Sequence, residues 1–198
     1  MMLTAALAGA APAAAAGAAD PAAFFAENCA VCHGADAGGV EGLGPNLTDG
    51  RWIWGGDRTT VRGTIAYGVR NGDAAARDAR MPAFGVEGLL YDDEIAAIVA
   101  AILSAAGDPG TDAEVAAQGA DLYLDHCAMC HGDAMEGGYM PGAPALTGPN
   151  WLFGGSAAAL SAQIHDPAHG VMPGWRDQLG EAGVAAMADY VLSLRAAP

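Results

Sequence analysis

The chain has 198 residues, with 23 acidic side chains against eight basic ones, all of them arginine, and a formal net charge of −15 at pH 7. Because nucleic-acid binding depends on clustered Lys and Arg that neutralise phosphates, this balance argues against nucleic acid as a partner. The length allows two domains of about 90 to 100 residues each. Ala and Gly supply much of the 53% hydrophobic content, so few large side chains are left to fill a core.

Residues 1–19 form an Ala-rich leader that we interpret as a signal peptide, a linker or a truncated anchor. Small residues before Asp20 suit a signal peptidase, but the segment has no Lys or Arg and few Leu. Pro12 and several glycines interrupt the apolar run, which argues against a transmembrane helix.

A short helix is predicted directly after the leader. Asp20 and Pro21 are a favourable N-cap and first helical position, and the helix delivers Phe24 and Phe25 to a core just before Cys29. It leads into the word CAVCHG at 29–34.

All four cysteines of the chain fall in two copies of one word, CAVCHG at 29–34 and CAMCHG at 127–132. C-x-x-C-H is typical of covalent c-type haem, in which the two thiols form thioethers and the next residue presents imidazole to the iron. The predicted residues are Cys29, Cys32 and His33 in the first copy and Cys127, Cys130 and His131 in the second. The alternatives are two zinc half-sites that pool the cysteines and two surface disulfides.

The stretch GPNLTDGRWIWGGD at 44–57 returns as APALTGPNWLFGGS at 143–156, so the repeat extends beyond the haem words and indicates a tandem duplication. We divide the chain into a first domain, 20–107, and a second, 108–198. The four tryptophans are predicted to pack against porphyrin, with indole N–H donation to a propionate as an added role. They are Trp52, Trp54, Trp151 and Trp175. Arg58, with Arg51 and Arg62, is predicted to pair with propionates of the first haem.

Two Met-Pro pairs, at Met81 and Met172, stand at matched places in the halves. A methionine thioether is a common second axial ligand of haem iron, so both are predicted ligands. The alternatives are that either Met packs in the core, or that His165 or His169 replaces Met172 to give a bis-His haem. Whether each Met serves the haem of its own half is left open.

Helices are also predicted near the end of each half. In 92–104, Ile95, Ile98, Val99 and Ile102 form one apolar face, and Gly107 ends the helix before an interdomain turn at 108–110. In the second half, Thr111 and Glu114 form a capping box for the helix before Cys127. The segment 181–195 repeats the apolar pattern of 92–104. The predicted fold class is therefore all-α.

The words CAVCHG, GPNLTD, WIWGG and MPAFG, followed by CAMCHG, PALTGPNWLFGG and HGVMPGW, resemble the dihaem subunit of cbb3-type cytochrome c oxidases, subunit III, called CcoP or FixP. The resemblance runs from about Asp20 to Leu194. It implies two tandem class I cytochrome c domains, each wrapped around one covalent haem c. Carried onto this sequence, Met81 would serve the first haem and Met172 the second.

The resemblance further implies that the chain passes single electrons from a soluble or membrane-bound cytochrome c toward the monohaem and haem–copper subunits. It would act on the periplasmic side of the bacterial inner membrane and would be no enzyme on its own. The family has an N-terminal transmembrane anchor where this chain has the leader. Ala101 stands in the first half where the second half has Tyr190, with Phe24 and Phe25 as compensation.

Three alternative functions remain open from the sequence. The first is a free dihaem carrier of the soluble periplasm, and the others are a dihaem enzyme such as a peroxidase or dehydrogenase and a gas-sensing haem module. The last two need an open distal position on at least one iron, which Met81 and Met172 argue against.

Overall fold

The computed structural model describes residues 20–148 and 151–195, and the leader 1–19 lies outside them. The regular elements of this part of the chain are all helical, as the all-α prediction requires, and only isolated β-bridges occur beside them. In order they are α1 (Pro21–Phe24), the π-helical turn η1 (Phe25–Cys29), α2 (Ala30–His33), α3 (Arg58–Tyr67), α4 (Asp92–Ala105), α5 (Ala113–His126), α6 (Ala128–His131), α7 (Ala157–His165) and α8 (Arg176–Ser193). None of these helices is long and apolar enough to cross a membrane.

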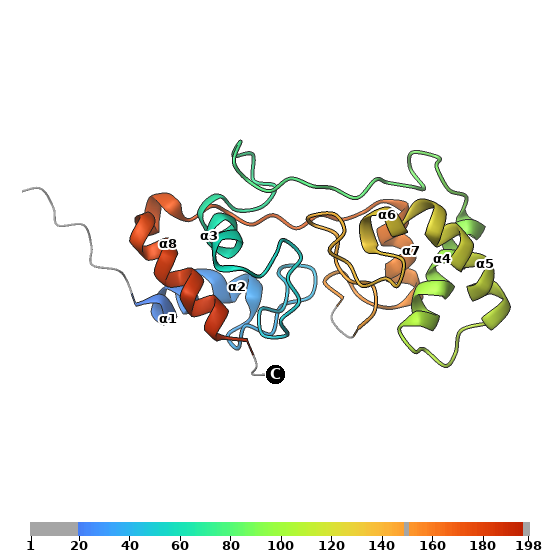
Figure 1. Ribbon diagram of the computed structural model, residues 1–198, viewed down its shortest axis with the longest axis horizontal. Coiled ribbons are helices and arrows are strands. Elements are labelled where there is room, and N and C mark those ends of the chain that lie inside the picture. Colours follow the sequence, from blue (N-terminus) through green and yellow to red (C-terminus); the bar gives the residue numbers. More distant parts are fainter. Residues whose placement is uncertain (1–19, 149–150, 196–198) are drawn as a thin grey trace, which may run out of the picture.

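The helices gather at the two ends of an elongated molecule (Figure 1). One end holds α1, η1, α2, α3 and α8, which we call the split unit because α8 comes from the far end of the chain. The other holds α4, α5, α6 and α7, which are consecutive and which we call the continuous unit. Two extended segments, 68–91 and 166–175, connect the units.

The closing helix of each sequence half packs on the other half. Helix α4 packs against α5 and α7, whereas α8 packs against α3 and α1. Residues 106–112 are the only link between α4 and α5, and so short a link favours antiparallel packing of the two helices. The predicted boundary after Gly107 therefore separates the two sequence repeats, while the packing units cross it.

Each unit has its own apolar core. In the continuous unit, the four predicted residues of α4 are buried against α5 and α7, which confirms the apolar face read from their spacing. The buried members there include Ile95, Ile98, Val99, Ile102, Tyr123, Leu160 and Ile164. The core of the split unit includes Phe25, Val61, Ile65, Val184, Met187 and Val191.

Helices α4 and α5 approach closely at Gly119. A Cβ atom placed there would lie 1.8 Å from the carbonyl oxygen of Ala97, far inside van der Waals contact. At the other end of the molecule, the ring of Tyr190 on α8 lies 5.7 Å from that of Phe25. The aromatic partner of Tyr190 thus comes from the opposite half of the sequence.

The helix starts show where the capping predictions succeed. Asp20 accepts a hydrogen bond from the backbone N–H of Ala22 and Pro21 is the first helical residue, as predicted. The predicted Thr111 capping box is wrong, because Asp112 caps α5 by accepting from the N–H groups of Glu114 and Val115. A carboxylate is at least as good a cap as threonine, and here it stands one residue nearer the helix.

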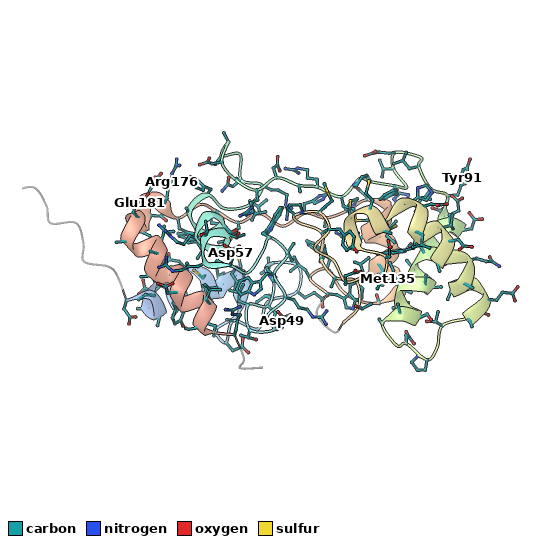
Figure 2. The ribbon with its side chains drawn as sticks, viewed as in Figure 1. Asp49, Asp57, Tyr91, Met135, Arg176 and Glu181 are labelled. Carbon is teal, nitrogen blue, oxygen red and sulfur yellow. The ribbon has the colours of Figure 1, made fainter. Side chains whose placement is uncertain are left out.

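Two helices, α3 and α7, were not predicted. Asp57 and Ser156 cap them through their side chains, and Figure 2 shows Asp57 at the start of α3. Each cap directly follows the Gly-Gly pair of its repeat, WIWGG in the first half and WLFGG in the second. Helix α8 is broken at Gly180, where φ is 62°, so its longer second part begins at Glu181, the predicted start of the closing helix, and a short helical stretch from Arg176 precedes it.

Candidate functional site

The two C-x-x-C-H words form equivalent sites, one in each unit. Each histidine ends a one-turn helix, α2 or α6, and its Nδ1 lies within hydrogen-bond distance of a proline carbonyl. The distance is 2.9 Å from His33 to Pro45 and 2.8 Å from His131 to Pro144. A carbonyl oxygen only accepts, so Nδ1 carries the proton and Nε2 keeps its lone pair for a metal.

Burial lowers the pKa of both histidines, which favours the neutral imidazole that binds a metal. Pro45 and Pro144 are functional residues that the sequence reasoning missed. The signal that could have revealed them is their equivalent place in the repeated words GPNLTD and APALTG.

The four cysteines are free in the structure, and those of each word lie in a different unit. Burial is the main cause that raises the pKa of Cys29, and it raises the pKa of Cys127 to about 11. Both groups are therefore neutral thiols at neutral pH, held beside the core of their unit.

The predicted methionine ligands lie in the unit opposite to their own sequence half. Met81 packs against the core of the continuous unit, which contains Cys127. Met172 packs against the core of the split unit, against which Cys29 also packs. This placement is the reverse of the pairing that the resemblance implied.

Equivalent backbone hydrogen bonds hold the two methionine loops in place. Phe84, three residues after Met81, donates its N–H to the Ile164 carbonyl of α7 at 3.2 Å, and Trp175, three residues after Met172, donates to Ile65 of α3 at 3.0 Å. Ile65 and Ile164 are counterparts in the repeat, so each Met-Pro turn is seated on the same position of the other half.

Two further contacts restrain the methionines themselves. Met172 exchanges two backbone hydrogen bonds of 2.9 Å with Val69, and its carbonyl also accepts from the Asn71 side chain at 3.1 Å. The N–H of Met81 donates to Nε2 of His169 at 3.0 Å. His169, considered as a substitute for Met172, thus lies against Met81. The ring of the other candidate, His165, packs at Gly85, where a Cβ would lie 2.0 Å from it.

The four tryptophans separate into two groups. Trp52 and Trp175 pack on the core of the split unit and Trp151 on that of the continuous unit. The residues Gly56 and Gly155 make room for Trp52 and Trp151, since a Cβ at either glycine would lie 2.3 Å from the indole. Trp54 lies between the units instead, next to Gly142.

The arginines predicted to meet propionates have diverse partners. Arg58 forms an exposed ion pair with Asp189, with two hydrogen bonds of 2.5 and 2.8 Å. Arg51 donates to the carbonyl of Thr147 at 2.5 Å. Arg62 has a buried Nε without a partner, while its Nη2 lies 3.7 Å from Glu181.

The split unit fits a bound anionic group. The indole Nε1 of Trp52 and the Nε of Arg62 are both buried and both lack a hydrogen-bond acceptor. An unpaired buried donor costs about 1–3 kcal/mol, so two in one unit indicate an acceptor supplied by something bound there. A haem propionate has this chemistry.

Tyr123 supports the second haem word from within the core of the continuous unit. It is 1% exposed, and its hydroxyl donates to the carbonyl of Gly132 at 2.7 Å. Tyr123→Phe leaves that carbonyl unpaired, and we expect a loss of about 1–3 kcal/mol in the free energy of unfolding, measured by denaturant titration. The matched control is Tyr139→Phe at a 59% exposed ring, which should be neutral. Equal losses in the two variants would contradict the assigned role.

A C-x-x-C-H word against a small helical core, with the histidine fixed by a proline carbonyl, is the arrangement of c-type cytochromes. The chain belongs to the family of cytochrome c oxidase, cbb3-type, subunit III, whose family model matches residues 16–100 and 114–191. The two matched segments correspond to the two sequence repeats.

Individual relatives carry the same family name. The chain is 41% identical over 170 residues to the cbb3-type cytochrome c oxidase subunit FixP of Bradyrhizobium diazoefficiens, which covers 86% of this chain and 58% of that protein. It is 41% identical to subunit CcoP of Cereibacter sphaeroides, over 87% of this chain and 59% of that protein. For CcoP of Azospirillum brasilense the identity is 40%, over 86% and 60% respectively. The chain thus spans about three-fifths of the length of these relatives.

Proposed function

We propose that this chain binds two covalent haem c groups and transfers single electrons within a cbb3-type terminal oxidase. The electrons would enter from a soluble or membrane-bound cytochrome c and leave toward the monohaem and haem–copper subunits. The observation that carries this proposal is that each of the two cores packs against one C-x-x-C-H word and one of the two Met-Pro methionines.

The proposed ligand sets cross the two halves of the sequence. The first haem is held by Cys29, Cys32, His33 and Met172, and the second by Cys127, Cys130, His131 and Met81. The two cytochrome c domains are then intertwined rather than consecutive, with each closing helix donated to the other unit. In this proposal, the predicted domains 20–107 and 108–198 are repeats of the sequence, and neither forms a folded unit by itself.

The mechanism needs no acid, base or nucleophile from the protein. Bound haem c supplies the iron that cycles between the ferric and ferrous states. The proline carbonyl behind each ring orients the imidazole so that Nε2 could bind the iron, and the methionine thioether would supply a second ligand that favours the ferrous state. With both ligands bound, the iron would have no place for a substrate, which supports a role in electron transfer without catalysis by this chain on its own.

Trp52 gives a direct test of the first haem position. Trp52→Phe removes the buried indole N–H that we propose donates to a propionate. We expect a lower reduction potential of the first haem, because the propionate charge becomes less compensated, and a loss of about 1.5–3 kcal/mol in the stability of the haem-bound protein. The potential of the second haem is the internal control in the redox titration. An unchanged first potential would refute the donation.

The proposed location is the periplasmic side of the bacterial inner membrane. Haem c is attached outside the cytoplasm, in the compartment where cysteines otherwise oxidise. The net charge of −15 would steer a basic electron donor toward the chain.

The deciding experiment is a native separation of detergent-solubilised membranes from the source cells, stained for haem and for oxidase activity. We expect this chain to migrate with an active haem–copper oxidase. Recovery of the chain in the soluble fraction alone would indicate a free dihaem carrier instead. Strong carbon monoxide binding by the reduced protein would indicate an enzyme or a gas sensor.

A further inference from the structure

One side chain lies where the two connecting segments pass each other. The guanidinium of Arg70 donates from Nε to the carbonyl of Gly170 at 2.8 Å and from Nη1 to the carbonyl of Ala79 at 2.8 Å. Ala79 is two residues before Met81, and Gly170 is two residues before Met172. One side chain therefore holds both methionine-bearing segments at equivalent positions.

The backbone of Arg70 is also specifically held. Its φ of 49° lies in the left-handed region, which is uncommon for a residue with a side chain. Its N–H donates to the Arg77 carbonyl at 2.8 Å, and the preceding residue, Val69, forms the antiparallel bridge to Met172. Unusual backbone conformations of this kind persist where the surrounding contacts require them.

The charge of Arg70 lies between the two units. The guanidinium carbon lies 5.5 Å from the centre of the Trp54 ring, and the side chain is half-buried. Burial is the main cause that lowers the pKa of Arg70 from its usual value, with a further contribution from the neighbouring Arg80. A guanidinium nevertheless stays protonated in proteins, so the charge is permanent.

We propose that Arg70 is a positioning residue for both axial methionines, and that it couples the ligation of the two haems. The proposal rests on the proposed function, since it takes Met81 and Met172 as the ligands. Arginine suits this position because its planar fork presents several N–H groups in fixed and different directions. A lysine ammonium is a single compact donor centre and cannot reproduce both contacts in the same geometry.

The neighbouring residues provide matched controls. Of the two methionines, Asn71 contacts Met172, through its carbonyl, and His169 contacts Met81, through its N–H. Arg77 lies over the same Trp54 ring, at 5.9 Å, but its side chain bonds to Thr64 and Thr60 of α3 and to neither methionine segment. Among these four residues, only Arg70 donates from its side chain to the carbonyls two residues before each methionine, those of Ala79 and Gly170.

The experiment uses the full chain with both haems attached. Arg70→Lys keeps the positive charge but loses the simultaneous contact with Ala79 and Gly170. Arg70→Gln loses the charge as well as this double contact. Three quantities are measured: the sulfur-to-iron charge-transfer absorption of the ferric protein, the two reduction potentials, and amide hydrogen exchange of peptides containing Met81 and Met172.

We expect Arg70→Lys to weaken the absorption of both haems, to lower both potentials and to speed exchange in both peptides. Arg70→Gln should lower the potentials further, because it also removes a positive charge. Arg77→Lys should leave all three quantities as in the wild type. Asn71→Ala should affect only the haem served by Met172, and His169→Ala only the one served by Met81.

A change at one haem alone, or none at either, in Arg70→Lys would overturn the coupling. If Arg70→Gln fails to assemble, Arg70→Lys still decides the matter, since it retains the charge. The failure of the proposed function would look different, because the wild type itself would then lack the sulfur-to-iron absorption.

Discussion

Met172→Ala is expected to open the iron of the haem that we propose is attached at Cys29 and Cys32. Met81→Ala is expected to open that of the haem proposed at Cys127 and Cys130. The reason is the crossed packing, in which Met172 and Cys29 pack against one core, and Met81 packs against the core that contains Cys127. Each variant should bind carbon monoxide strongly at one haem after reduction, whereas the wild type should bind none.

The two haems must be told apart for this measurement. Cys29→Ala leaves the first haem attached through Cys32 alone, and the vinyl group that remains moves its visible absorption to longer wavelength. In this background we expect carbon monoxide to change the shifted band in Met172→Ala and the unshifted band in Met81→Ala. The opposite assignment would show that each methionine serves the haem of its own sequence half.

Gly119→Ala and Gly63→Ala are expected to change the free energy of unfolding in opposite directions. At Gly119 the added methyl would lie 1.8 Å from the Ala97 carbonyl, so α4 and α5 must separate. We expect a loss of about 1–3 kcal/mol, as for other overpacked cores.

Gly63 is the matched control for this substitution. It lies inside α3, and the nearest atom to an added Cβ is the flexible end of Arg77 at 3.8 Å. Alanine should stabilise this helix by about 0.5–1 kcal/mol. Denaturant unfolding of the three proteins measures both effects, and a Gly119→Ala protein as stable as the wild type would contradict the close packing of α4 on α5.

The sequence predicts those elements whose signal is local. The spacing of Ile95, Ile98, Val99 and Ile102 identifies α4, because burial of one helix face requires that period. Helices α3 and α7 were missed because they are short and follow glycine-rich segments, so that only their caps, Asp57 and Ser156, mark where they begin.

The crossed packing was beyond the reach of sequence reasoning for a physical reason. Because of the repeat, the carbonyls of Ile65 and Ile164 are equivalent hydrogen-bond acceptors for the backbone that follows a Met-Pro pair. The sequence near Phe84 does not indicate which of the two it binds. The choice depends on chain geometry, and the short link 106–112 between α4 and α5 is its clearest sign in the sequence. The hydrogen bonds of Arg70 reach residues up to 100 positions away, so no local sequence pattern predicts them.

The donation of α8 to the split unit sets the order in which the parts of the chain can finish folding during synthesis. Helices α4 to α7 are consecutive, so all residues of their core are synthesised before α8. The residues Phe25, Val61 and Ile65 emerge first, yet their core waits for Val184 and Val191. Closing so long a loop is slow, and the apolar surface stays exposed in the meantime. The part made first is therefore the part finished last.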